Sequence, residues 1–285
     1  MKIKKISLML FNNLNGVLGI SIIIFFILLA IFADFISPHD PVNQNLDLRF
    51  KPPVWHENAE PDYILGTDHL GRDIMSRIIY GSRISLTVGF SSVLISCILG
   101  IITGLYAGFN KGVFDHIISR IIDIQLSIPY LLLAVSIIMI FGSSMINIIF
   151  VLVLYGWTVF ARIVRAETLK LANSEFVAAA EIIGNSKFKI VFLHILPNAF
   201  NPIIIIATVE IANMIIFEAG LSFLGLGIKP PTPSWGTMLS DGRDYIYGFI
   251  WWPSTFAGLS IFFLVFSVNI FGDWLRDHLD PRITN

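Results

Sequence analysis

The sequence predicts an all-α membrane protein with six transmembrane helices. Charged residues make up 14% of the chain and hydrophobic residues 55%, and the mean hydropathy is +0.77. Soluble domains carry roughly 25% charged residues, so this chain is too apolar for a soluble fold. Six separate apolar stretches approach or exceed the roughly 20 residues that a helix needs to cross a bilayer.

The six apolar stretches follow one another along the chain, with polar segments between them. The first run is longer than the roughly 7–15 residues of a signal-peptide core and lacks a small-residue cleavage site, so we expect a retained helix. The predicted spans cover about 16–33, 85–107, 117–141, 145–161, 202–217 and 250–271.

Several residues modify this simple pattern. Asp123, Gln125 and Pro129 predict a third span that is kinked or partly lined by polar groups. Asn201 followed by Pro202 is typical of a helix start, with an N-cap and a proline at the first helical position, so it sets the start of the fifth span. Glycines of the second span are expected to allow close helix packing.

Basic residues predict how the chain is oriented, because cytoplasmic loops carry an excess of Lys and Arg. Six spans place both termini on one side, and a cytoplasmic N-terminus puts most of the 19 Lys and Arg inside. Loops at about 34–84 and 218–249 then face outward, and the polar segment 162–200 faces the cytoplasm. We divide the chain into an anchor helix with its outer loop, 1–84, and a core of five spans, 85–285.

The sequence also excludes several classes of function. A net charge of −1 argues against nucleic acid as a partner. No Gly-x-x-x-x-Gly-Lys-Ser/Thr loop, no His-Glu-x-x-His motif and no tight histidine spacing occur, so we expect no ATP site, no metal site and no cofactor. Asp123 and Glu210 lie on different predicted spans without a supporting motif, which disfavours an intramembrane protease. A channel or ion-coupled carrier remains a rival to a transport subunit.

Within the predicted cytoplasmic segment, the spacing predicts two short amphipathic helices. Asn173 or Ser174 caps the first helix, and Gly184 with Asn185 ends it. Its apolar stripe has the i, i+3, i+4, i+7 spacing and consists of Phe176, Ala179, Ala180 and Ile183. The second helix starts at Ser186, ends at Pro197, and has a stripe formed by Phe188, Val191, Phe192 and Ile195. A hairpin on the membrane surface without a partner is the alternative interpretation.

This segment resembles the EAA loop of ABC importer permeases, in which Glu-Ala-Ala, three residues and Gly precede Ile-x-Leu-Pro. Ala178 stands at the position of the motif glutamate and His194 at that of the isoleucine. In the family, the loop forms coupling helices that enter a cleft of the ATPase subunit. The resemblance therefore implies an ATPase-coupling loop formed by Glu175, Phe176, Ala179, Ala180, Glu181, Gly184, Leu196 and Pro197.

Further blocks resemble the C-type subunit of the dipeptide, oligopeptide and nickel permeases. They lie at residues 66–73, 76–77, 81–86, 123–129, 218–227, 230–236 and 272–282. The resemblance implies the type I importer permease fold in the bacterial cytoplasmic membrane. It also implies a second, non-identical permease, two subunits that bind and hydrolyse ATP with Mg²⁺, and an external substrate-binding protein. Peptides are the expected substrates, and nickel or a metal–chelator complex is the alternative.

Polar residues inside the spans are costly in lipid and should face protein or water. Glu210 and Asn213 share a helix face, and with Asp123 and Gln125 they are candidates for the translocation path. Glu210 and Asn213 can instead form an interhelical hydrogen bond that holds the two permeases together, and Asp123 and Gln125 can instead cap or kink the third span. We expect Glu218 to be structural. The interleaved outer charges predict a solvated ion-pair network rather than a ligand site. These are Asp68, Arg72, Asp73, Arg77 and Arg83.

Overall fold

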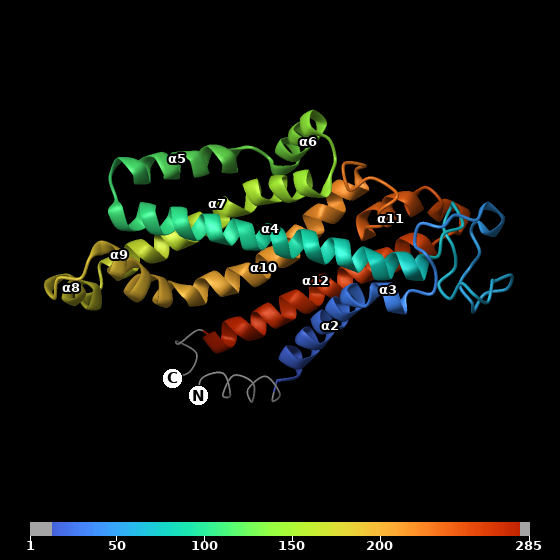
Figure 1. Ribbon diagram of the computed structural model, residues 1–285, viewed down its shortest axis with the longest axis horizontal. Coiled ribbons are helices and arrows are strands. Elements are labelled where there is room, and N and C mark those ends of the chain that lie inside the picture. The colour runs from blue at the N-terminus through green and yellow to red at the C-terminus, as the bar shows by residue number, and fades with distance from the viewer. Residues whose placement is uncertain (1–12, 280–285) are drawn as a thin grey trace.

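The computed structural model describes residues 13–279, and this part of the chain is helical without a named strand (Figure 1). The predicted positions of the two termini and the end of the 272–282 block lie outside the described residues. The long helices are α2 (Leu14–Ile31), α4 (Ile74–Asn110), α5 (Val113–Ser127), α6 (Tyr130–Phe141), α7 (Met145–Ala172), α10 (Leu196–Phe223) and α12 (Trp252–Leu279). The shorter ones are α3 (Ala33–Ile36), η1 (Leu46–Leu48), α8 (Glu175–Ile182), α9 (Lys187–Lys189), the π-helical η2 (Ile190–Ile195), α11 (Trp235–Arg243) and η3 (Ile246–Gly248).

Six spans, one of them broken, account for the apolar part of the fold. Five helices, in which α9, η2 and α10 count as one, are long and apolar enough to cross a membrane. The pair α5 and α6 adds a sixth span if it is counted as one, and it bends by 89° at its break. Pro129 precedes α6 directly, so the predicted kink of the third span is confirmed.

Several helices extend beyond the predicted spans. Helix α4 begins at Ile74 rather than near 85, because the Asp73 carboxylate accepts a hydrogen bond from the Ser76 N–H at 2.8 Å and caps it. Arg77 and Arg83, which were expected in the outer loop, therefore lie within α4. Helix α10 likewise runs on to Phe223, so the predicted boundary at 218 is also wrong. Hydropathy marks the apolar part of a helix, whereas capping residues mark its ends.

The expected roles of the two prolines at the start of α10 are wrong. Pro197 does not end a helix and Pro202 does not begin one, because η2 continues into α10 and Pro202 lies inside it. In η2 the Leu196 N–H bonds to the Val191 carbonyl, five residues back. Such wide turns and neighbouring helices accommodate the carbonyls that a proline leaves unpaired, so spanning helices tolerate proline.

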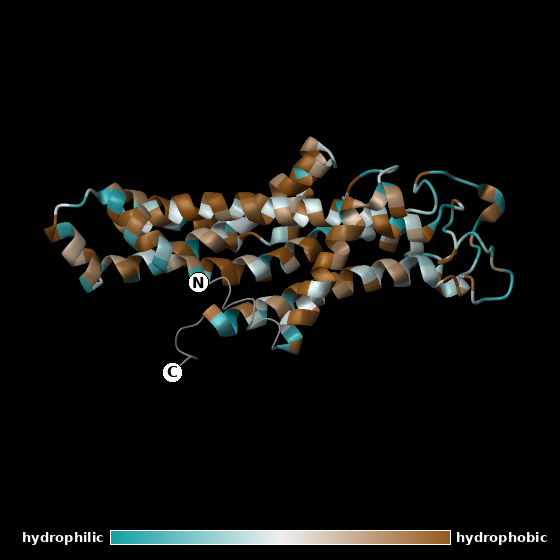
Figure 2. Ribbon diagram, turned by 60° about the horizontal axis from the view of Figure 1, so that its bottom comes forward, coloured by the Kyte–Doolittle hydropathy of each residue, from teal (hydrophilic) through white to brown (hydrophobic). Residues whose placement is uncertain are grey.

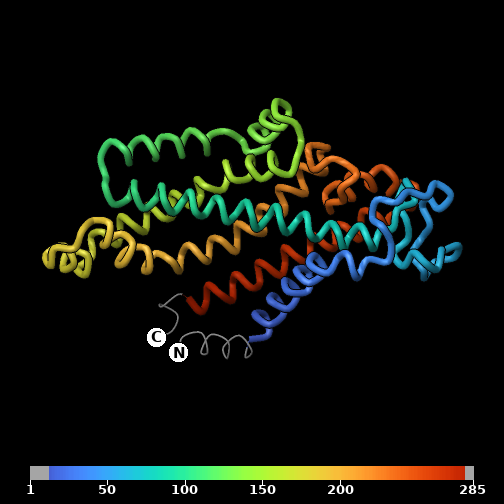
Figure 3. The backbone as a smooth tube through the Cα atoms, in the orientation of Figure 1, coloured from blue at the N-terminus to red at the C-terminus, as the bar shows by residue number. Residues whose placement is uncertain are grey.

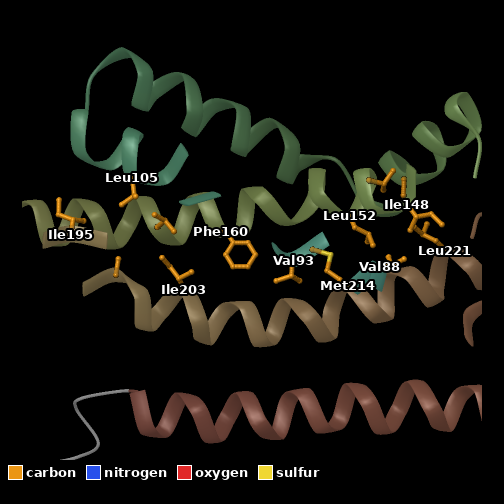
Figure 4. Packing of buried hydrophobic residues seen from close by; sticks show 14 of the residues in the cluster. Val88, Val93, Leu105, Ile148, Leu152, Phe160, Ile195, Ile203, Met214 and Leu221 are labelled. Carbon is orange, nitrogen blue, oxygen red and sulfur yellow. The ribbon is translucent and has the colours of Figure 1, made fainter. Parts of the chain in front are cut away.

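The main core lies between α4, α7 and α10, and Figure 4 shows its side chains, among them Phe160 and Met214. Helices α4 and α7 approach closely along a stripe of glycines. A Cβ added to Gly100 would lie 2.3 Å from the Phe160 Cβ, and one added to Gly104 would lie 2.7 Å from the Ala161 carbonyl oxygen. Only glycine permits this separation, which is typical of spanning helices without a hydrophobic drive to associate.

A second core joins the N-terminal helix to the last one. Phe26 of α2 packs edge-on against Trp235 of α11, with ring centroids 5.3 Å apart. Gly19 of α2 meets the backbone of α12 near Ser267 and Phe271. Helix α2 therefore lies along α12, as the tube in Figure 3 also shows.

The long helices end in two different surroundings. Helices α8 and α9 protrude at one end, which we call the α8 end, and the loops with α11 and η3 form the other, the α11 end (Figure 1). The segment 37–73 and the segment 224–251 both lie at the α11 end, where Figure 2 shows many hydrophilic residues. The basic residues assigned the segment 162–200 to one side of the membrane and the loops 34–84 and 218–249 to the other. In the structure these two groups lie at opposite ends of the long helices.

Candidate functional site

Helix α8 is held to the rest of the chain by two small apolar side chains. Val177 and Ala180 are 1% and 4% exposed and join the core cluster that contains Ile190 and Ile195. Of the predicted stripe of Phe176, Ala179, Ala180 and Ile183, only Ala180 is buried within this chain, and the other three residues are exposed. Val177, three residues before Ala180, supplies the second buried position of the helix.

Gly184 ends α8 in the manner that its position predicted. Its φ is +85°, a conformation that costs other L-residues energy. The Asn185 N–H bonds to the Ala180 carbonyl and the Gly184 N–H to the Glu181 carbonyl, which together form a Schellman motif. A Cβ at Gly184 would meet no atom within 4 Å, so the glycine serves backbone conformation rather than packing within this chain.

The start of each short helix differs in its capping. Ser174 occupies the N-cap position of α8, but its hydroxyl donates to the Leu171 carbonyl and does not cap the helix. The Ser186 hydroxyl accepts from the Lys189 N–H at 3.4 Å, so the predicted second start is confirmed. Helix α7 extends to Ala172 and the next long apolar helix begins at Lys187, so the predicted loop 162–200 lies outside these two helices only between 173 and 186.

Large apolar side chains cover the outer face of this end. We call the exposed residues of α8, Ile183 and Phe188 the α8 surface. Ile182, Ile183 and Phe188 are 86%, 80% and 70% exposed, and the rings of Phe188 and Phe192 lie 4.4 Å apart. Of the residues predicted to couple, Glu175, Phe176, Ala179, Glu181, Gly184 and Pro197 are exposed, Leu196 is half-buried and Ala180 is buried. Exposed apolar patches of this kind mark interaction sites.

Glu218 lies at the junction of α4 and α10 and is fully buried. The Ser222 hydroxyl donates to its Oε1 at 2.8 Å, and the Ser85 hydroxyl of α4 donates to its Oε2 at 3.3 Å. Both carboxylate oxygens thus have partners, and one partner comes from another helix. This geometry favours the structural role that we expected for Glu218.

Glu210 lies two turns earlier on the same helix and has fewer partners. It is 4% exposed, and its Oε1 accepts from the Asn213 side chain at 3.1 Å. Its Oε2 is buried and has no hydrogen-bond partner. Within this chain the Asn213 amide bonds to Glu210 on the same helix, and a hydrogen bond from this pair to the second permease stays a prediction.

Phe217 of α10 belongs to a cluster of three aromatic rings that sequence reasoning missed. Phe217 stacks on Tyr130 of α6 with centroids 4.4 Å apart, and Tyr155 of α7 meets Phe217 edge-on at 5.1 Å. Tyr130 and Tyr155 themselves lie 5.2 Å apart. The three residues come from three helices, and no sequence spacing links them.

The remaining candidates of the third span divide into two environments. The Gln125 side chain bonds to the Leu154 carbonyl and accepts from the Trp157 indole N–H at 3.1 Å, so it ties α5 to α7. Asp123 is exposed on α5. A cavity of about 170 Å³ lies at the α5–α6 bend and is lined by Gln125, Leu126, Ile128, Pro129, Tyr130, Leu133, Tyr155 and Thr158.

At the α11 end the predicted ion-pair network exists, but it is not solvated. Arg72 pairs with Asp68 at 2.7 Å and with Asp241 of α11 at 3.1 Å, and Arg77 is within 4.0 Å of both carboxylates. Asp68, Arg72 and Arg77 are each less than 5% exposed. The alternating charges in the sequence could not reveal this burial. The helix that covers the cluster, α11 with Asp241, lies 160 residues or more further along the chain.

Two of the expected members of the network lie elsewhere. Asp73 caps α4, and its other neighbour is His39, at 3.5 Å. Arg83 pairs with the exposed Asp34 at 3.1 Å and donates to the Ala30 carbonyl, which ties α4 to the end of α2. Within the described residues, no group of three or more His, Cys, Asp or Glu is arranged to hold a metal ion.

Comparison with known families matches two separate parts of the chain. Residues 100–285 match the family described as the inner membrane component of binding-protein-dependent transport systems. Residues 6–53 match the N-terminal transmembrane domain of oligopeptide transport permease C.

Individual relatives match over 95% or more of the chain. The chain is 40% identical to a di/tripeptide transport system permease of Pseudomonas aeruginosa, covering 96% of this chain and 90% of the relative. It is 42% identical to a dipeptide transport system permease of Haemophilus influenzae, covering 95% and 92%. An oligopeptide transport system permease of Bacillus subtilis is 38% identical, with 95% and 87% covered.

A solved structure gives the same fold. An inward-facing structure of the MetNI methionine ABC transporter superimposes with a TM-score of 0.59 at 20% identity, covering 73% of this chain and 98% of that chain. The chain therefore belongs to the inner membrane components of binding-protein-dependent transport systems, and it is a multi-pass permease of the ABC importer class with the type I fold.

Proposed function

We propose that this permease forms half of the translocation pore of an importer for di- or tripeptides. The observation that carries the proposal is the match over 95% or more of the chain to permeases named for dipeptide or di/tripeptide transport. These names favour peptides over nickel or a metal–chelator complex as the substrate. A second, non-identical permease supplies the other half of the pore.

The α8 surface is the proposed contact with the ATP-hydrolysing subunits. It combines exposed apolar side chains with the charges of Glu175 and Glu181 at the protruding end of the chain. Two such subunits bind ATP with Mg²⁺, close on each other and push α8, while the chain itself binds no nucleotide. Because α9, η2 and α10 are continuous, the displacement passes into the membrane and switches the pore between inward- and outward-facing states.

The proposed orientation places the α8 end and both termini in the cytoplasm. It is supported by the excess of basic residues at this end and in the terminal segments. The α11 end then faces outward and receives the substrate-binding protein. Its buried ion pairs hold 37–73 and α11 together, which gives the docking protein an ordered surface.

The proposed translocation path includes Asp123, Gln125, Glu210 and Asn213. Glu210 and Asn213 lie near the middle of α10, where a polar group needs protein or water as a neighbour. Asp123 and Gln125 lie in the last turns of α5, just before the 89° bend.

Reconstitution of the complete importer tests the substrate. Proteoliposomes that contain this chain, its partner permease and both ATPase subunits are supplied with the binding protein and either labelled dialanine or labelled Ni²⁺. We expect uptake of dialanine that depends on ATP hydrolysis and on the binding protein. ATP-dependent uptake of Ni²⁺ without uptake of dialanine would refute the peptide assignment.

A matched pair of variants tests the coupling surface. Ile183→Glu places a charge on the α8 surface, and Val54→Glu places one on an exposed apolar residue of the α11 end. We expect Ile183→Glu to reduce the amount of ATPase that copurifies by tenfold or more and Val54→Glu to leave it unchanged. Equal copurification with both variants would place the ATPase contact elsewhere and favour a channel or carrier.

A further inference from the structure

We propose that Glu210 and the rings of Tyr130, Tyr155 and Phe217 form a binding site for the α-ammonium group of a peptide in transit. This inference rests on the proposed peptide transport and assigns a selective site within it. The site combines an incompletely paired acid, three aromatic faces and an adjoining cavity, and the three helices α6, α7 and α10 contribute to it.

The first observation is the state of the Glu210 carboxylate. It lies at the middle of α10, is 4% exposed, and leaves Oε2 without a hydrogen-bond partner. Among residues 13–279, no nitrogen of Lys, Arg or His lies within 4.0 Å of it. A buried carboxylate without a positive partner is costly and is rarely kept for stability alone. A cation that arrives during transport would supply the missing partner.

Glu218 shows how the same helix treats an acid that is structural. It is more deeply buried than Glu210, yet serines of α4 and α10 donate to both of its oxygens. The fold therefore supplies donors to Glu218 and withholds one from Glu210. The difference between two acids on one helix is the reason for assigning them different roles.

The second observation is the aromatic cluster that includes Phe217, two turns after Glu210 on α10. Residues seven apart share a helix face, and Tyr155 contacts the rings of both Phe217 and Tyr130. Ring faces attract ammonium groups within about 6 Å, and a neighbouring carboxylate adds a direct ion pair. Acid and rings together favour a primary ammonium group over an anion or an uncharged group.

The third observation is the cavity at the α5–α6 bend. Its volume of about 170 Å³ is lined by Tyr130 and Tyr155, and the buried Tyr130 hydroxyl has no hydrogen-bond partner. One water molecule occupies about 30 Å³ in the liquid. The cavity therefore has space for an ammonium group together with its Cα and Cβ atoms. Tyr155 lines this space and contacts Phe217, which shares a face of α10 with Glu210.

The chemistry of the site distinguishes peptides from metal ions. Every unmodified di- or tripeptide carries an α-ammonium group, whatever its side chains, so one acid with aromatic walls serves many sequences. A nickel ion needs several nitrogen, oxygen or sulfur ligands at once. One carboxylate with two phenols and a phenyl ring does not provide such a set.

The experiment uses the reconstituted importer with binding protein preloaded with labelled dialanine. Three variants are compared with the parent chain: Glu210→Gln, the conservative Glu210→Asp, and Glu218→Gln as the matched structural control. Initial uptake and the melting temperature of the purified complex are measured for each. We expect Glu210→Gln to reduce uptake at least tenfold without lowering the melting temperature, and Glu210→Asp to keep uptake within threefold of the parent.

Glu218→Gln should lower the melting temperature, because it removes an acceptor that the two serines need. A second measurement reports access directly. In a Cys97→Ser background, Glu210→Cys should react with 2-aminoethyl methanethiosulfonate during turnover, and loaded binding protein should slow the reaction. Glu218→Cys should not react.

The outcomes separate the two proposals. If the parent importer takes up no dialanine, the peptide assignment fails and this inference fails with it. If the parent takes up dialanine, the inference alone is overturned by any of three results. These are uptake by Glu210→Gln within twofold of the parent, a melting temperature as low as that of Glu218→Gln, or an unreactive cysteine at position 210.

Discussion

Replacing Gly104 by alanine tests the close packing of α4 against α7. The added Cβ would lie 2.7 Å from both the Ala161 carbonyl oxygen and the Val164 Cβ, whereas ordinary contacts begin near 3.4 Å. Both neighbours are backbone or the branch point of a side chain, so neither can rotate away. The two helices must separate by several tenths of an ångström, and overpacking of this kind costs about 1–3 kcal/mol.

The higher helix propensity of alanine offsets roughly 0.5–1 kcal/mol of that cost. The net loss is therefore about 0–2.5 kcal/mol, and its central value of roughly 1.3 kcal/mol corresponds to a fall of roughly 2–5 °C in melting temperature for a chain of this size. Thermal unfolding of the purified complex, followed by tryptophan fluorescence, measures this change.

Gly258 of α12 provides the matched control. A Cβ there would meet only Leu239, at an ordinary contact distance of 3.6 Å, so Gly258→Ala should leave the melting temperature unchanged or raise it. If Gly104→Ala is as stable as the parent, the helices are not held at the separation that the glycines permit. A fall of equal size for Gly258→Ala would show that glycine matters in these helices for another reason.

Three further predictions concern the two ends of the chain. Gly184→Ala should strain the end of α8 by about 1–2 kcal/mol and lower ATP-coupled uptake. Gly184→Asn should lower uptake less, because Asn tolerates a positive φ better. Equal uptake for both variants would show that the positive φ of Gly184 is not what matters for coupling. Asp241→Asn leaves Arg72 with Asp68 as its single acidic partner and should lower the stability of the α11 end by about 1–3 kcal/mol. The loss should be detected as faster proteolysis of the segment 37–73. The control Asp244→Asn should leave the rate of proteolysis unchanged. Burial lowers the pKa of His69, so the unfolded loop binds a proton more readily than the folded one, and the stability present above about pH 6.5 should decline as the pH falls below it. Hydrogen exchange around His69 measured between pH 7.5 and 5.5 checks this, and a flat profile would contradict it.

The sequence predicted the elements that follow from composition and local spacing. Hydropathy located every span, Pro129 located the break, and Gly184 located the end of α8 with its Schellman bonds. It failed at Pro202, because the rule that proline begins a helix describes helices in water. Inside a membrane, neighbouring helices accommodate the carbonyl that the proline leaves unpaired and remove much of the penalty.

The functional residues were predictable only in part. Glu210 and Glu218 attract attention because acids are rare inside spans, but only the structure shows that donors reach one and not the other. The ring of Tyr130 meets that of Phe217 from a position 87 residues away along the chain, and no single-sequence pattern encodes such a pair. The same holds for Asp241, whose contact with Arg72 turns a supposedly solvated cluster into a buried one.

The length of two helices has a mechanical consequence. Helix α4 and the continuous segment Lys187–Phe223 each contain 37 residues, which corresponds to a rod of about 55 Å. The hydrocarbon core of a bilayer is only about 30 Å thick, so both rods project well beyond it or lean strongly. A rod of this length that tilts by about 5° about one end displaces the other by about 5 Å. Helices of this length run from the α8 end to the α11 end, so a movement at one end reaches the other through continuous helix rather than through a flexible linker.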